Sequence, residues 1–90
     1  MSVGIQTTPL GYQQITPTSV QSLTVPAGAN QALLVAEVQG IRIRDDGVAP
    51  TTSVGWLLPV NVPFLYTGTL TAVQVINATS GGILNVLYYK

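Results

Sequence analysis

Short runs of apolar and β-branched residues, separated by turns rich in glycine and proline, fill most of the 90-residue chain. Val, Ile and Thr together supply 29 residues, and these side chains fit a pleated strand better than a helix. No window repeats apolar residues at the spacing of one helix face over a useful length. The pattern therefore predicts an all-β chain.

Seven or so short strands follow from the alternation and from the turn residues between them. Their predicted ranges are 19–25, 31–39, 41–44, 54–58, 62–67, 69–77 and 83–89. Strands at such regular spacing are typical of a β-sandwich or a small barrel. We predict a single compact β-sandwich with jelly-roll-like character over residues 19–90. An extended, irregular N-terminal arm over residues 1–18 precedes it, with residues 12–15 as its one segment of strand character.

The pattern also predicts how individual strands are covered and connected. Residues 33–36 are apolar on both faces, which suits a strand covered on each side, either by two sheets or by a partner subunit. At Gly40 the apolar face changes parity, which predicts a β-bulge or a corner between sheets. Pro59 and Pro63 confine the strands beside them to edges or strand ends. The last two predicted strands are expected to pair as a hairpin.

Charge is scarce and clustered. Only six residues are charged, the net charge is zero, and five of the six lie between Glu37 and Asp46. A typical soluble domain is about a quarter charged, so this neutral surface favours a subunit packed against other subunits. Three Lys and Arg residues in all are too few for a nucleic-acid interface. Because a small chain without cysteine has no disulfide to reinforce a modest core, we expect a homo-oligomer.

Catalysis, cofactor binding and membrane insertion lack the residues they need. The chain has neither histidine nor cysteine, so it holds no Ser-His-Asp triad and no zinc site built on those ligands. The first residues show no basic stretch with an apolar run, and the longest apolar run, 32–36, is far shorter than the about 20 residues that span a bilayer. We predict no enzymatic activity, no cofactor, no metal, no signal peptide and no membrane partner.

The charge cluster contains most of the candidate contact residues. Arg42 and Arg44 share one face of a strand, about 7 Å apart, where they are placed to clamp an acidic partner. The alternative is local pairing with Asp45, Asp46 or Glu37. The two aspartates either cap a turn, ligate a hard cation or join the partner contact. We predict that Arg42→Ala combined with Arg44→Ala weakens assembly more than it weakens the isolated fold.

Two aromatic residues complete the candidate partner contacts. Trp56, the only tryptophan, is either a core residue or an interface anchor. Tyr88 and Tyr89 point to opposite faces of the last predicted strand, so one belongs in the core and the other is exposed. We take Tyr89 as the candidate contact.

Three segments of the chain can be compared with known proteins, and the Arg-Asp-Asp-Gly-Pro-Thr order of the first is distinctive. They are Arg42-x-Arg44-Asp45-Asp46-Gly47-x-x-Pro50-Thr51-x-x-Val54-Gly55, Tyr66-x-Gly68-x-Leu70 and Asn85-Val86-x-Tyr88-Tyr89. This order resembles small proteins encoded among the capsid and tail genes of tailed bacteriophages. The likeness covers roughly residues 20–90 and leaves out the arm. The segment Trp56-Leu57-Leu58 is bulkier than the pattern of that group, which suggests a partner-specific contact.

The resemblance implies a structural role in a virion, and it carries no catalytic residue to this chain. It implies the major capsid protein or other virion proteins as partners. Combined with the neutral composition, it predicts a non-enzymatic protein that decorates or cements a bacteriophage capsid. The alternatives are a neck, tail or head-fibre component, or a receptor- or carbohydrate-binding β-sandwich module that uses Trp56 or an exposed tyrosine.

Overall fold

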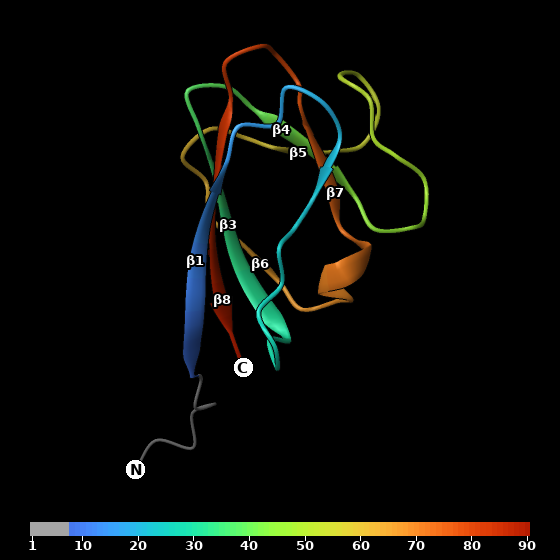
Figure 1. Cartoon of the computed structure of the whole chain (residues 1–90). Coiled ribbons are helices and arrows are strands. Elements are labelled where there is room, and N and C mark those ends of the chain that lie inside the picture. The colour runs from blue at the N-terminus through green and yellow to red at the C-terminus, as the bar shows by residue number, and fades with distance from the viewer. Residues whose placement is uncertain (1–7) are drawn as a thin grey trace.

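Two four-stranded antiparallel sheets face each other in the computed structural model, which describes residues 8–90 (Figure 1). The first sheet has the strand order β1-β8-β3-β6, and the second has the order β2-β7-β4-β5. The strands are β1 (Pro9–Ile15), β2 (Gln21–Ser22), β3 (Gln31–Glu37), β4 (Ile41–Arg44), β5 (Trp56–Leu58), β6 (Phe64–Tyr66), β7 (Gln74–Asn77) and β8 (Ile83–Tyr89). One short 3-10 helix, η1 (Leu70–Ala72), precedes β7. The prediction of an all-β sandwich is confirmed.

The strand pairs are nested about the middle of the chain. β4 pairs with β5, β3 with β6, β2 with β7 and β1 with β8, all antiparallel. Every connection except the one from β4 to β5 crosses from one sheet to the other. The predicted hairpin of the last two strands is therefore wrong. β7 pairs with β2 and β4, whereas β8 lies between β1 and β3 in the opposite sheet.

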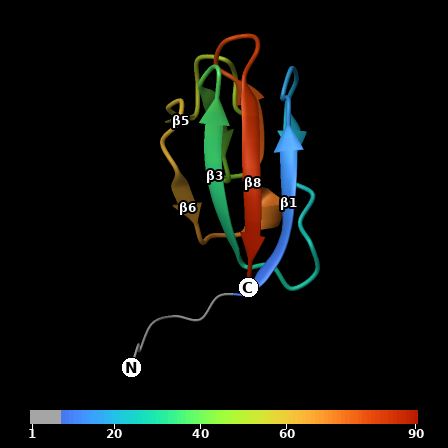
Figure 2. The same cartoon turned by 90° about the vertical axis from the view of Figure 1, so that its left-hand side faces the viewer.

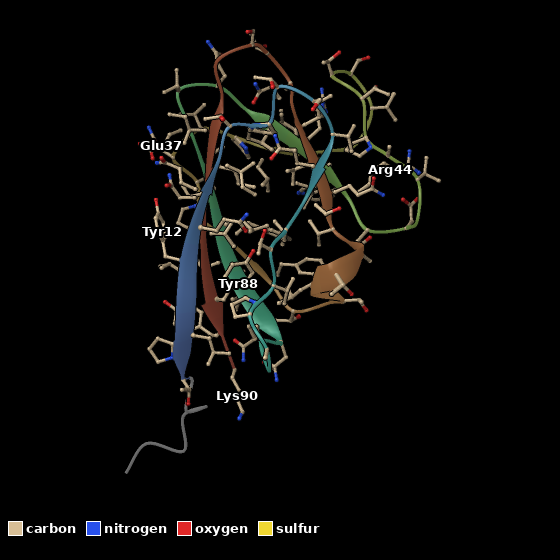
Figure 3. The ribbon with its side chains drawn as sticks, in the orientation of Figure 1. Tyr12, Glu37, Arg44, Tyr88 and Lys90 are labelled. Atoms are coloured by element: carbon tan, nitrogen blue, oxygen red, sulfur yellow. The ribbon has the colours of Figure 1, made fainter. Side chains whose placement is uncertain are left out.

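The core lies between the inner faces of the sheets, where alternate residues of each strand meet. In β3 and β8, every second side chain is fully buried: Ala32, Leu34, Ala36, Leu84, Val86 and Tyr88. The second sheet supplies mainly Ile41, Ile43, Leu58 and Val75, and Val73 just before β7 adds to them. Figure 3 shows the ring of Tyr88 between the two sheets. This arrangement follows from the period of two along a strand, which sends neighbouring residues to opposite faces.

The predicted corner at Gly40 lies where the chain changes sheets. β3 ends at Glu37 in the first sheet, and β4 begins at Ile41 in the second. Val38 takes a positive φ of 70°, which turns the chain between them. A Cβ atom on Gly40 would lie 2.9 Å from Cδ1 of Leu57 and 3.3 Å from the carbonyl oxygen of Leu58, so β5 packs closely against this corner.

The strand boundaries differ from the predicted ones near the N-terminus. Residues 9–15, assigned to the arm, form β1 and pair with β8 along the edge of the first sheet. The edge of β8 supplies the backbone hydrogen bonds that this polar segment lacks by itself, and Ile15 is buried in the core. Residues 1–7 of the predicted arm lie outside the described residues. The predicted strand 19–25 is reduced to Gln21–Ser22.

The two proline-flanked strands occupy the predicted positions. β5 is an edge strand of the second sheet, and β6 is an edge strand of the first. Both are only three residues long, shorter than the predicted ranges 54–58 and 62–67. The predicted strand 69–77 likewise begins as η1 and becomes extended only at Gln74.

Candidate functional site

The outer face of the first sheet carries a row of apolar side chains that crosses all four strands. Tyr12 of β1 lies beside Leu87 of β8, Leu87 beside Leu33 of β3, and Leu33 beside Leu65 of β6. Figure 2 views the molecule from this side, with β6, β3, β8 and β1 next to one another. Tyr12 is 59% exposed and Leu65 is 53% exposed. No described segment of the chain covers this row.

A polar cluster centred on Asn85 lies beside the apolar row. The hydroxyl of Tyr12 and the side-chain amide of Gln14 both donate to Oδ1 of Asn85, the latter over 3.1 Å. The amide of Asn85 in turn donates to Oε1 of Glu37. Among the outward positions of the four described strands, Glu37 carries the only charge. The cluster fixes the ring of Tyr12 over the sheet, and Figure 3 shows Tyr12 and Glu37 on the side away from the core.

The same face is hollowed next to the row. The hollow has a volume of about 440 Å³, with Tyr12 on one side and Asn61 and Pro63 on the other. The segment that contributes Asn61 runs along β3, since the backbone N–H of Asn61 donates to the carbonyl oxygen of Ala36 over 2.8 Å. Asn61 takes a positive φ of 64° in this turn. The outer face thus presents both a protruding ring and an apolar depression.

Four of the five clustered charges, Arg42, Arg44, Asp45 and Asp46, lie on β4 of the second sheet and in the turn after it, and two of them pair with each other. Arg44 donates to both carboxylate oxygens of Asp46, from Nε over 3.0 Å and from Nη2 over 2.5 Å. This hydrogen bond lowers the pKa of Asp46 to about 2 and raises the pKa of Arg44. Arg42 donates from Nη1 to the carbonyl oxygen of Gly55 over 3.2 Å, while its buried Nε has no partner among the described residues. Local pairing, one of the two predicted interpretations, therefore describes Arg44 and Asp46.

Asp45 and Asp46 bind different partners: Asp46 binds Arg44, whereas Asp45 binds Tyr66. Its Oδ2 accepts a hydrogen bond of 2.7 Å from the hydroxyl of Tyr66, which lies on β6 of the other sheet. Burial, and next this hydrogen bond, raise the pKa of Tyr66 to about 12. The turn after β4 is thereby tied to the first sheet. The role of the two arginines and two aspartates as partner contacts stays a prediction.

The aromatic candidates divide between surface and core. Trp56 is 66% exposed, so its interpretation as a core residue is wrong. Tyr88 is buried and donates to Oε1 of Gln13 over 2.6 Å, and burial raises its pKa to about 12. Tyr89 lies half-buried on the outer face of the first sheet, opposite Gln31 of β3. The two tyrosines do point to opposite faces, as predicted.

Sequence reasoning missed most residues of the outer face. The predicted contacts include Tyr89 from this face but not Tyr12, Leu65 or Leu87. Residues 33–36 did indicate this face, because they are apolar on both sides of β3. The second sheet can cover only one of those sides, so the other had to be an apolar outer face. The outward positions of 83–89 alternate in the same way and include Leu87. If β3 and β8 had been predicted as neighbours, Leu33 and Leu87 would have been placed next to each other on this face.

Other site types are not found in the part of the chain that the structure describes. Residues 8–90 contain no group of three or more possible metal-ligating side chains. None of the described helices has the length and apolar character needed to cross a membrane. No protein-family model matches the chain, and neither a curated protein nor a solved structure matches it.

Proposed function

We propose that this chain is a non-enzymatic structural protein of a bacteriophage virion, where it decorates or cements the capsid as a small homo-oligomer. In this proposal two copies meet through the outer face of the first sheet. One observation carries it: the central strands β3 and β8 carry apolar side chains on both faces, yet within residues 8–90 only one of these faces is covered. A second copy would remove the exposed row of Tyr12, Leu87, Leu33 and Leu65 from water.

The size of the face is that of a modest subunit contact. Four strands spaced by about 4.8 Å, each of up to seven residues rising about 3.4 Å, give a footprint on the order of 20 by 24 Å. A standard interface buries about 800 Å² of accessible surface per partner. The flat footprint is roughly half of that area. Side chains that project from the sheet, and the segment around Pro63, add to the accessible surface. A contact of this size suits a subunit that is also held by other neighbours.

The distribution of charge and shape allows a two-fold contact. A two-fold interface brings the same surface of each copy together, so the surface must complement itself. The protruding ring of Tyr12 and the neighbouring hollow supply the two complementary shapes on one face. Glu37 is the last residue of β3 and lines one end of the hollow. A two-fold axis perpendicular to the strands therefore sets the two glutamates at opposite ends of the contact, which limits their repulsion.

The strand order adds support at the level of the fold. Nested pairs that alternate between two four-stranded sheets are the arrangement from which we infer the jelly-roll character. Eight-stranded jelly rolls are found in viral capsid and lectin domains. Because one fold serves many functions, this likeness supports the proposal but does not carry it.

Counting the copies of the chain in purified phage particles tests the virion role and its position. Decoration or cementing predicts many copies, in a fixed ratio to the major capsid protein. A few copies located at one vertex would overturn decoration in favour of a neck, tail or head-fibre component. Absence of the chain from washed, infectious particles would overturn the virion role itself.

A further inference from the structure

Trp56 is exposed on β5, and the edge strands β5 and β6 of the two sheets lie on the same side of the molecule (Figure 2). Its side chain shares the inward face of β5 with Leu58 and is paired with Ile43 of β4, yet it is 66% exposed. A hollow of about 200 Å³ lies beside it. The hollow is lined by Ile43, Arg44, Asp45, Trp56, Phe64 and Tyr66.

The polar groups of this hollow are held in place by residues around it. The buried hydroxyl of Tyr66 fixes one carboxylate oxygen of Asp45 at 2.7 Å. Asp46 fixes two of the three nitrogens of the Arg44 guanidinium. Each of these pairings uses only part of the group, so Asp45 retains a second acceptor oxygen and Arg44 a third donor nitrogen. An acceptor and a donor thus stand in set positions beside an aromatic surface, which is the preorganisation a binding site needs.

These features select the chemistry of the ligand. An indole offers a flat apolar surface, which matches the C–H face of a pyranose ring. A carboxylate and a guanidinium side by side match a pair of neighbouring hydroxyl groups, each of which both donates and accepts. Their opposite charges favour a neutral ligand over an anion or a cation. The hollow of about 200 Å³ has room for several water molecules, and so for a small ring such as one sugar.

We propose that the hollow beside Trp56 binds a single neutral sugar ring, stacked on the indole and hydrogen-bonded to Asp45 and Arg44. The site is separate from the outer face of the first sheet. It would give a subunit bound through that face a means of attaching to a glycan. Its failure would leave the proposed structural role intact, and the structural role could fail while this site binds.

The fluorescence of Trp56 gives a direct assay, because it is the only tryptophan in the chain. The full chain is titrated with the methyl glycosides of glucose, galactose, mannose and N-acetylglucosamine at millimolar concentrations. At least one glycoside is expected to give a saturable change in the indole emission. Chemical-shift changes in NMR spectra should then map to the residues of the hollow. No saturable response to any of the four would overturn the proposal.

Three variants, compared by NMR titration, test whether Trp56 forms a sugar site or a contact with another protein. Trp56→Ala is expected to weaken binding about tenfold or more, and Trp56→Tyr to retain most of it, since a ring surface remains. Leu65→Ala, which alters the outer face, should bind like the unchanged chain. Equal binding by Trp56→Ala would overturn the proposal. A lower oligomer mass for Trp56→Ala, without any response to the glycosides, would identify Trp56 as a protein contact instead.

Discussion

Removing the hydroxyl of Tyr66 tests how the charge cluster is joined to the fold. Tyr66→Phe keeps the ring, which is only 8% exposed, and deletes the 2.7 Å hydrogen bond to Asp45. A hydrogen bond to a charged group contributes about 1.5–3 kcal/mol. Asp45 is exposed, so its carboxylate regains water when the hydroxyl is removed. We therefore expect a loss at the lower end of that range, about 1.5 kcal/mol in the free energy of unfolding.

Urea unfolding at neutral pH measures this loss through the shift of the midpoint at constant slope. A double-mutant cycle with Asp45→Ala isolates the contribution of the pair from that of each residue alone. We expect a coupling energy of about 1 kcal/mol between the two residues. A coupling energy near zero, with both single variants as stable as the unchanged chain, would refute the claim that Tyr66 anchors the turn after β4.

Three further changes test the core, the buried tyrosines and a close backbone approach. Leu34→Ala, at a fully buried position of β3, should lower the free energy of unfolding in urea by about 2–5 kcal/mol. A loss no larger than that of Leu87→Ala on the outer face would contradict the assigned core. Tyr66 and Tyr88 have their pKa raised to about 12, above the usual value near 10, so the stability they contribute is complete below about pH 10 and is lost as the pH rises through 12. Tyrosinate absorbance should show Tyr66 and Tyr88 titrating near 12, and titration of these two groups near 10 in the folded chain would count against their burial. Gly82→Ala places a Cβ 2.8 Å from Cδ1 of Ile41, so it should lower stability by about 1–3 kcal/mol, and an unchanged thermal midpoint would show that the site has room.

Much of the fold could be predicted, because the alternation of apolar residues and the positions of glycine and proline indicate where strands lie and end. The change of apolar parity at Gly40 marked the crossing between sheets, and the prolines at 59 and 63 marked two edge strands. The predicted hairpin of the last two strands was wrong because strands that are neighbours in sequence can lie in different sheets. Here the residues of β7 and β8 line opposite walls of the core, so the chain crosses over between them.

The candidate site was harder to predict, because exposure depends on how the sheets are placed. Trp56 has the inward parity of a core residue, yet it is 66% exposed, whereas Leu58 on the same face of the same edge strand is buried. The pairing of Arg44 with Asp46 was one of two interpretations that the sequence left open. The sequence left open whether a second sheet or a partner subunit covers the other face of β3, and strand order was needed to show that residues 8–90 cover only one face.

The mass of the purified chain in solution tests the central claim most directly, when Leu87→Glu is compared with Leu57→Glu. Both leucines are similarly exposed, 39% and 43%, but Leu87 lies on the outer face of the first sheet and Leu57 on the second sheet. Native mass spectrometry should give a multiple of the 9.4 kDa chain for the unchanged protein and for Leu57→Glu, and a single-chain mass for Leu87→Glu. A single-chain mass for all three, or an oligomer that survives Leu87→Glu, would contradict the claim that copies meet through this face.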